Sequence, residues 1–166
     1  AGWSGLTHGP CLEAALSLAG TGVRPWSPDS PALYRLTVSA DTPDAHIWGY
    51  LDEVDGSGKV EVIAFGRLAL SHRKAGTAPY DTMGLPWHSG LRADVSPLRP
   101  GTRAQLQFAM TAISRVIPAG HRLRLTIAGA DPRQRTLAEI RQDPAPRITV
   151  WRGGGTASAI ELPVVR

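Results

Sequence analysis

The chain has 166 residues, with 18 lysines and arginines against 14 acidic side chains, a net charge of +4 and 42% hydrophobic content. A chain of this length buries enough surface for one hydrophobic core without disulfides or metals. Its single cysteine, Cys11, excludes an internal disulfide and a multi-cysteine zinc site. The apolar runs are far shorter than the ~18 residues that cross a bilayer, so we expect a soluble protein. The sequence leaves its location open, and we favour a bacterial-type cytoplasm.

The first predicted elements are two strands. Segment 12–18 has leucines and alanines that fit either the helical or the strand period, and we assign it as a strand. Segment 33–39 alternates clearly, which places Tyr34, Leu36 and Val38 on one face. We expect that face to point into the core, because the other face carries arginine and threonine.

The middle of the chain predicts a β-hairpin. Segments 46–54 and 59–70 are rich in β-branched and aromatic residues, and they flank an Asp-Gly-Ser-Gly turn. Period-two alternation between turn residues recurs along the whole chain, whereas a sustained helical period does not. This pattern is typical of an all-β sandwich or barrel.

The clearest strands follow at 105–113 and 121–129. In both, polar side chains alternate with a row of large apolar ones, namely Leu106, Phe108, Met110, Leu123, Leu125 and Ile127. The chain closes with strand-like segments 147–152 and 159–165, joined through three consecutive glycines. We predict that these last two form another hairpin.

Two segments lack any alternation, residues 72–101 and residues 130–146. Loops this long inside a compact domain are usually functional or interfacial. The second could hold one helical turn at 137–141. For the first, an ordinary loop packed on itself is the alternative to an interface.

Catalytic, cofactor and metal motifs are missing from the sequence. The nearest string to the G-x-S-x-G nucleophile elbow is Gly2-Trp3-Ser4-Gly5, which is one residue too short. No phosphate-binding or calcium-binding loop has the right spacing, and the five histidines include no close pair. The tryptophans are scattered and the charge is modest, so we expect no nucleic-acid partner either.

Several strings nevertheless resemble the C-terminal domain of the cocaine-esterase (CocE/NonD) and X-prolyl dipeptidyl-peptidase family of serine hydrolases. The order and spacing agree from about Leu12 to Val165, and G-R-L-x-x-S-H-R and A-G-H-R-L-R-L are fairly specific. The strings are IWGYLDEVDGSGKVEVIAFGRLALSHRK (47–74), APYDTMGLPWHS (78–89), PLRPG (97–101) and IPAGHRLRLTIAGAD (117–131).

This resemblance implies a jelly-roll β-sandwich, similar to galactose-binding modules, that follows an α/β-hydrolase domain and packs on it. The catalytic triad of such enzymes lies in the hydrolase domain, so no catalytic, cofactor-binding or metal-binding residue carries over to this chain. We therefore expect one accessory domain over residues 1–166, with residues 1–11 peripheral and the catalytic domain absent. The first residue is Ala1, not Met, which fits a module cut from, or encoded as, the non-catalytic end of a larger hydrolase.

In this interpretation the 72–101 loop covers the catalytic domain and helps to shape its active-site region. Tyrosine, tryptophan and arginine are the side chains that interfaces favour. The candidate interdomain residues are His72, Arg73, Tyr80, Trp87 and His88. A second group, read as a structural motif, comprises Gly120, His121, Arg122 and Arg124.

Two other functions stay open at this stage. A carbohydrate-binding module would stack sugar rings on exposed aromatic platforms, for which Trp26, Trp87 and Trp151 are the candidates. Alternatively, the chain is a stand-alone interaction domain that serves a separate hydrolase subunit or forms a homo-oligomer. The substrate class, ester or peptide, depends on residues outside this chain.

Overall fold

The computed structural model describes residues 2–4, 12–16, 32–131, 142–152 and 158–163. Over these residues the chain is all-β, as the alternating sequence pattern predicts, and its only helical pieces are two short 3-10 turns. The strands are β1 (Gly2–Ser4), β2 (Leu12–Leu16), β3 (Leu33–Ala40), β4 (His46–Val54), β5 (Val60–Ala69), β6 (Ala104–Ala109), β7 (Arg122–Ala128), β8 (Ile148–Trp151) and β9 (Ala159–Glu161). The 3-10 turns are η1 (Leu70–His72) and η2 (Arg92–Asp94).

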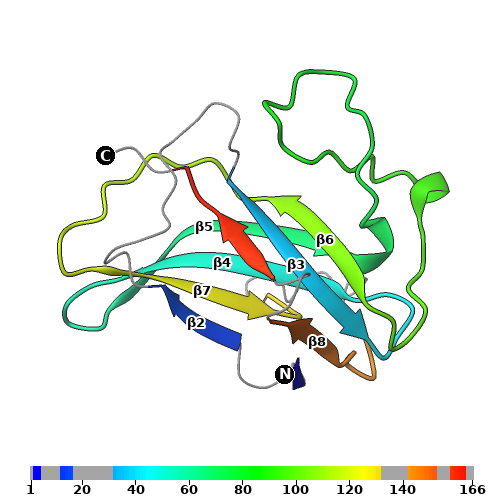
Figure 1. The fold of residues 1–166 in the computed structure, drawn as a ribbon, viewed down its shortest axis with the longest axis horizontal. Helices are drawn as coiled ribbons and strands as arrows, with labels where there is room; N and C mark the ends of the chain where they lie inside the picture. The colour runs from blue at the N-terminus through cyan, green and yellow to red at the C-terminus, as the bar shows by residue number, and fades with distance from the viewer. Residues whose placement is uncertain (1, 5–11, 17–31, 132–141, 153–157, 164–166) are drawn as a thin grey trace.

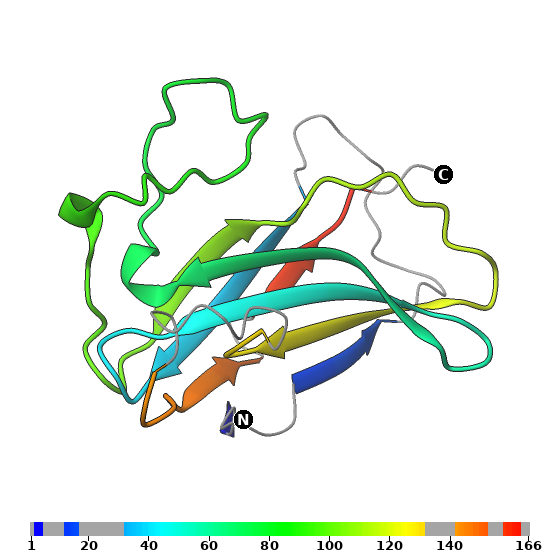
Figure 2. The ribbon, with the colours of Figure 1, turned by 180° about the vertical axis from the view of Figure 1, so that it is seen from behind.

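The strands form two antiparallel sheets packed face to face, with the first sheet in front in Figure 1 and behind in Figure 2. The first sheet has the order β1-β8-β3-β6, with β9 also paired to β3, and the second has the order β2-β7-β4-β5. From β1 to β8, every connection except the β4–β5 hairpin crosses between the sheets. These two strand orders are those of a jelly-roll β-sandwich.

The core lies between the sheets and uses the alternation seen in the sequence. Tyr34, Leu36 and Val38 of β3 are fully or almost fully buried, as expected. They pack in one cluster with Ile47 of β4 and Ile127 of β7 from the opposite sheet. Burial of one large aliphatic side chain is worth about 1.5–3 kcal/mol, so this cluster is the main source of the fold's stability.

Two glycines make room for the largest core side chains. Tyr34 and Phe108 are register partners on β3 and β6, and their rings stack with centroids 4.7 Å apart. Opposite them, Gly49 of β4 pairs with Gly66 of β5. A Cβ atom on Gly49 would lie 2.6 Å from the Tyr34 ring, so only glycine lets the ring sit against the second sheet. Burial raises the pKa of Tyr34 well above its usual value, and the nearby Asp52 carboxylate adds to this effect.

The predicted central hairpin is confirmed, and its turn has a clear local cause. Asp55 Oδ1 accepts hydrogen bonds from the Ser57 amide at 2.8 Å, the Ser57 hydroxyl at 2.6 Å and the Lys59 amide at 2.9 Å. These bonds, first of all that from the Ser57 hydroxyl, lower the pKa of Asp55. Aspartate side chains stabilise turns in this way by bonding to the backbone a few residues ahead.

The strand predicted at 105–113 is too long, because β6 ends at Ala109. Beyond that point the chain leaves its own sheet, and the Thr111 amide donates to the Phe65 carbonyl at 2.8 Å. The Phe65 amide donates in return to the Thr111 hydroxyl at 3.1 Å. Thr111 therefore joins the β6 side of one sheet to β5 of the other and closes this edge of the sandwich.

The predicted C-terminal hairpin is wrong. β8 pairs with Thr37–Ala40 of β3, whereas β9 pairs with Leu33–Arg35 of the same strand. Because β6 occupies the other side of β3, β8 and β9 lie end to end along one edge of it. Ser158 fixes the junction: its hydroxyl donates to the Trp151 carbonyl at 2.8 Å and accepts from the Thr37 amide at 3.0 Å.

At the N-terminal end, the strand assigned at 12–18 is confirmed over Leu12–Leu16, which pairs with β7. The segment called peripheral contributes β1, which pairs with β8 at the edge of the first sheet. The helical turn considered at 137–141 lies outside the described residues.

Candidate interdomain surface

The 72–101 loop begins at a rigid corner. β5 runs into η1, whose Leu70 is completely buried and donates its amide to the Ala45 carbonyl at 2.8 Å. The Asp44 carboxylate, in the β3–β4 connection, accepts the Ser71 amide at 2.8 Å and the Ser71 hydroxyl at 2.7 Å. These bonds attach the start of the loop to the sandwich.

The end of the loop returns to the same corner. The Arg73 guanidinium donates to the Leu70 carbonyl at 3.1 Å and, more closely, to the Ser96 carbonyl. The Ser96 amide donates to the Ser71 carbonyl at 2.7 Å. Two residues after Ser96, Leu98 is buried in the main core. The loop is therefore closed at its base, with ends fixed by hydrogen bonds and burial.

A second attachment lies halfway along the loop. The Gly76 amide donates to the Trp87 carbonyl at 2.9 Å, and these two residues form an isolated antiparallel bridge. The ring nitrogens of His88 lie 3.1 Å from the Lys74 carbonyl and 2.9 Å from the Gln107 carbonyl of β6. This bridge divides the loop, and we call residues 77–86 beyond it the tip.

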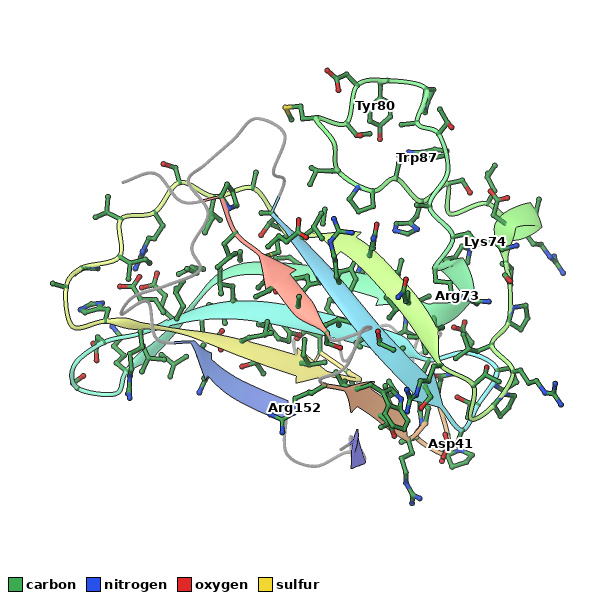
Figure 3. All side chains as sticks on the ribbon, in the orientation of Figure 1. Asp41, Arg73, Lys74, Tyr80, Trp87 and Arg152 are labelled. Atoms are coloured by element: carbon green, nitrogen blue, oxygen red, sulfur yellow. The ribbon has the colours of Figure 1, made fainter. Side chains whose placement is uncertain are left out.

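The tip projects away from both sheets in Figure 3, with Tyr80 at its far end and Trp87 nearer the sandwich. Tyr80 is 64% exposed and Met83 is 73% exposed. Farther along the loop, Leu91 is 62% exposed and Val95 is 41% exposed. The loop thus combines a well-fixed base with large apolar side chains in solvent.

The structure separates the five predicted interdomain residues into three groups. Arg73 and His88 bond to the backbone of the loop and of β6, so their polar groups hold the loop in shape. His72 and Trp87 are half-buried, and Trp87 packs over Gly76. Only Tyr80 of the five is mostly in solvent.

Sequence reasoning missed Met83, Leu91 and Val95. The available signal was a set of apolar residues in a segment without strand or helix period, since such residues cannot be assigned to a core by pattern. Exposure is decided by where the loop folds, which the local pattern does not encode.

The second predicted group joins the start of β7 to β4 of the β4–β5 hairpin. Gly120 has φ +84°, and the His121 amide closes a turn onto the Pro118 carbonyl at 3.1 Å. His121 Nδ1 lies 2.5 Å from Glu53 Oε1, and Arg115 Nε donates to Glu53 Oε2 at 2.8 Å. The hydrogen bond from His121, and then that from Arg115, lowers the pKa of Glu53.

The two arginines of this group differ in role. Arg124 Nε donates to the buried Asp52 carboxylate at 2.9 Å, and the Thr126 hydroxyl donates to the same oxygen at 2.8 Å. Arg122 is exposed. Buried carboxylates need such partners, because an unpaired buried charge is strongly destabilising.

The two candidate sugar platforms that the structure describes lie on different elements. Trp87 belongs to the 72–101 loop, Trp151 ends β8, and Trp26 lies outside the described residues. The Trp151 ring carries the Arg103 guanidinium 3.6 Å from its centroid, and its Nε1 donates to the Ser39 hydroxyl at 3.1 Å. A sugar stacking on that ring face would have to displace the arginine.

In the described part of the chain, no three metal-ligating side chains gather into a site. Nor is any helix found there that is long and apolar enough to cross a membrane.

Comparison with known proteins identifies the family. Residues 32–137 match the X-Pro dipeptidyl-peptidase C-terminal non-catalytic domain, which covers more than half of the chain. This chain belongs to that family. The matched region contains the whole 72–101 loop and the strands that hold it, β3 to β7. The exposed loop of this chain therefore lies inside the matched X-Pro dipeptidyl-peptidase C-terminal domain.

Two curated relatives of this C-terminal domain are each named "Putative serine esterase", one from Mycobacterium bovis and one from Mycobacterium tuberculosis. Each is 35% identical over 133 residues, which is 79% of this chain and 20% of the relative. The chain therefore spans about a fifth of the length of these relatives.

Solved structures show the same fold. A crystal structure of a CocE/NonD family hydrolase from Staphylococcus aureus superposes with a TM-score of 0.63 at 14% identity, over 93% of this chain and 30% of that one. A second crystal structure of the same hydrolase gives a TM-score of 0.58 at 17% identity, over 82% of this chain and 28% of that one. In both, the jelly-roll domain corresponds to under a third of the protein.

Proposed function

We propose that this chain is the C-terminal accessory domain of a serine hydrolase and that its 72–101 loop docks on the catalytic α/β-hydrolase domain near the active site. The observation that carries the proposal is the loop itself. Its base is fixed to the sandwich through Asp44, Arg73 and His88. Its tip presents Tyr80 and Met83 to solvent.

The energetics of the loop favour a partner. Tyr80 and Met83 gain little from the folding of this chain, because they stay in solvent, and they would gain from burial against a partner. A loop held rigidly by its base loses little conformational entropy on docking, so its apolar side chains bind at low cost. The share of the relatives that lies outside this domain supplies room for such a partner.

The relatives' names also bear on the substrate. They are named as esterases, so we propose an ester rather than an X-Pro peptide for the hydrolase that contains this domain. The specificity itself would reside in the acyl pocket of the catalytic domain.

Removal of the tip tests the docking proposal. Gly76 and Trp87 are bridge partners, so residues 77–86 can be replaced by Asn-Gly, the preferred two-residue hairpin link. In the 166-residue chain, we expect the unfolding midpoint to stay close to that of the wild type, because the tip adds little to the core. In the full-length hydrolase, we expect faster trypsin cleavage at the exposed Arg92 of the same loop and a lower kcat/KM for a short acyl ester.

The replacement of Val116 by asparagine is the matched control. Val116 is 86% exposed but lies in the β6–β7 connection, outside the 72–101 loop. This substitution removes a similar exposed apolar side chain, and we expect neither the trypsin cleavage rate nor kcat/KM to change. If tip removal leaves both the cleavage rate and kcat/KM of the full-length enzyme unchanged, the loop does not dock on the catalytic domain.

A further inference from the structure

The tip of the 72–101 loop is built around an unusual turn. The Leu85 amide donates to the Thr82 carbonyl at 3.0 Å, which closes a four-residue turn. Both central residues have positive φ, +53° at Met83 and +77° at Gly84. Among the residues that the structure describes, Met83 is the only one besides glycine with a positive φ.

Methionine is the wrong residue for this turn by local rules. Turns with two positive φ values prefer Asn, Asp or Gly at the first central position, because the Cβ atom of an L-residue crowds the backbone there and only Asn and Asp offset this through local hydrogen bonds. The Met83 amide donates to Asp81 Oδ1 at 2.8 Å, which helps to hold the turn. Its side chain, however, is 73% exposed and so gains little from packing within this chain.

Residues with strained backbone angles cluster at active sites and binding sites, where the surrounding structure maintains them. We propose that Met83 is a preorganised apolar anchor that inserts into a recess on the catalytic domain, an inference that rests on the docking function proposed above. The turn holds the side chain outward before contact, so docking costs little entropy. An unbranched thioether also adapts well to an irregular apolar pocket.

The position of the tip and the length of the relatives favour the catalytic domain as the occupant. Met83 and Tyr80 lie on the same tip, which projects beyond the sandwich (Figure 3). The matched region is 20% of the length of each relative, so most of each relative lies outside it. The partner recess is therefore expected to be apolar and to belong to that remaining part.

The substitution Met83→Asn separates the two roles of the side chain. Asparagine suits the positive φ, so the turn is kept while the apolar group is removed. In the 166-residue chain we expect the urea unfolding midpoint to be unchanged or higher. In the full-length hydrolase we expect trypsin cleavage at Arg92 to become at least tenfold faster, which corresponds to about 1.4 kcal/mol of lost docking energy. Met83→Leu, which keeps an apolar side chain on the same turn, should cleave within about threefold of the wild type.

Each outcome decides the inference. A lower unfolding midpoint for Met83→Asn in the 166-residue chain would show that the side chain serves the domain's own structure, and would overturn it. If tip removal accelerates cleavage of the full-length enzyme but Met83→Asn does not, docking stands and the anchor role is wrong. If neither change alters the cleavage rate or kcat/KM of the full-length enzyme, the docking function fails first and the anchor fails with it.

Discussion

The Asp44 carboxylate controls how firmly the 72–101 loop is attached, and its removal has a calculable cost. It accepts three hydrogen bonds, from the Ala45 amide at 2.9 Å, the Ser71 amide at 2.8 Å and the Ser71 hydroxyl at 2.7 Å. Ser71 is only 3% exposed, so Asp44→Ala leaves the Ser71 amide and hydroxyl without a partner and away from water. A stranded buried donor costs about 1–3 kcal/mol. We expect Asp44→Ala to lower the free energy of unfolding by about 2–4 kcal/mol.

Urea unfolding of the 166-residue chain measures this loss, and a double-mutant cycle assigns it. Ser71→Ala removes the hydroxyl but keeps the amide, so we expect it to lower the free energy of unfolding by about 1 kcal/mol. In the Asp44→Ala background, we expect Ser71→Ala to cost less than that. Asp41→Ala is the control, since Asp41 Oδ1 accepts only the exposed Arg147 amide among the bonds described. The reasoning is refuted if Asp44→Ala costs no more than Asp41→Ala, or if the two effects in the cycle simply add.

Two further predictions concern the sandwich itself. A Cβ atom on Gly66 would lie 2.2 Å from the Ala109 carbonyl oxygen, a backbone atom, whereas one on Gly49 would lie 2.6 Å from the Tyr34 ring. Overpacking costs about 1–3 kcal/mol, and we expect Gly66→Ala to lower the free energy of unfolding in urea more than Gly49→Ala does. Equal losses for the two variants would contradict this. The bonds from His121 and Arg115 lower the pKa of Glu53 below its ordinary 4.5, so its carboxylate stabilises the fold above that pH and this stability is lost as the pH falls through the lowered pKa. The stability gap between wild type and Glu53→Gln should therefore shrink below about pH 4.5, and a gap that is constant between pH 3 and 7 would rule it out.

Local patterns predicted most strands correctly, because a strand with one buried face leaves its alternation in the sequence. The β4–β5 hairpin was predicted for the same reason, together with its Asp55 turn. The C-terminal hairpin failed because two strand-like segments joined by glycines look alike whether they pair with each other or with a third strand. Pairing with β3 was decided by the free edge that β6 leaves on that strand.

The candidate surface was predicted only in outline. Its length and lack of period located the 72–101 loop, and the family motifs gave it an interdomain role. Which side chains face solvent depended on contacts between distant parts of the chain. Arg73 turns inward because the Ser96 carbonyl returns to it, and Met83 is exposed because the Gly76–Trp87 bridge places the tip beyond the sandwich.

The sequence by itself determined that this chain is an all-β module of a serine hydrolase family without a recognisable catalytic motif, since period, turns and family strings are local properties. The tertiary structure alone decided the order of strands, the end-to-end placement of β8 and β9, and the separation of the 72–101 loop into a fixed base and an exposed tip. The physical reason is that a side chain's exposure depends on what packs over it, and that neighbour is usually far away in sequence. Met83 shows this most plainly, because this apolar residue lies in solvent on a strained turn.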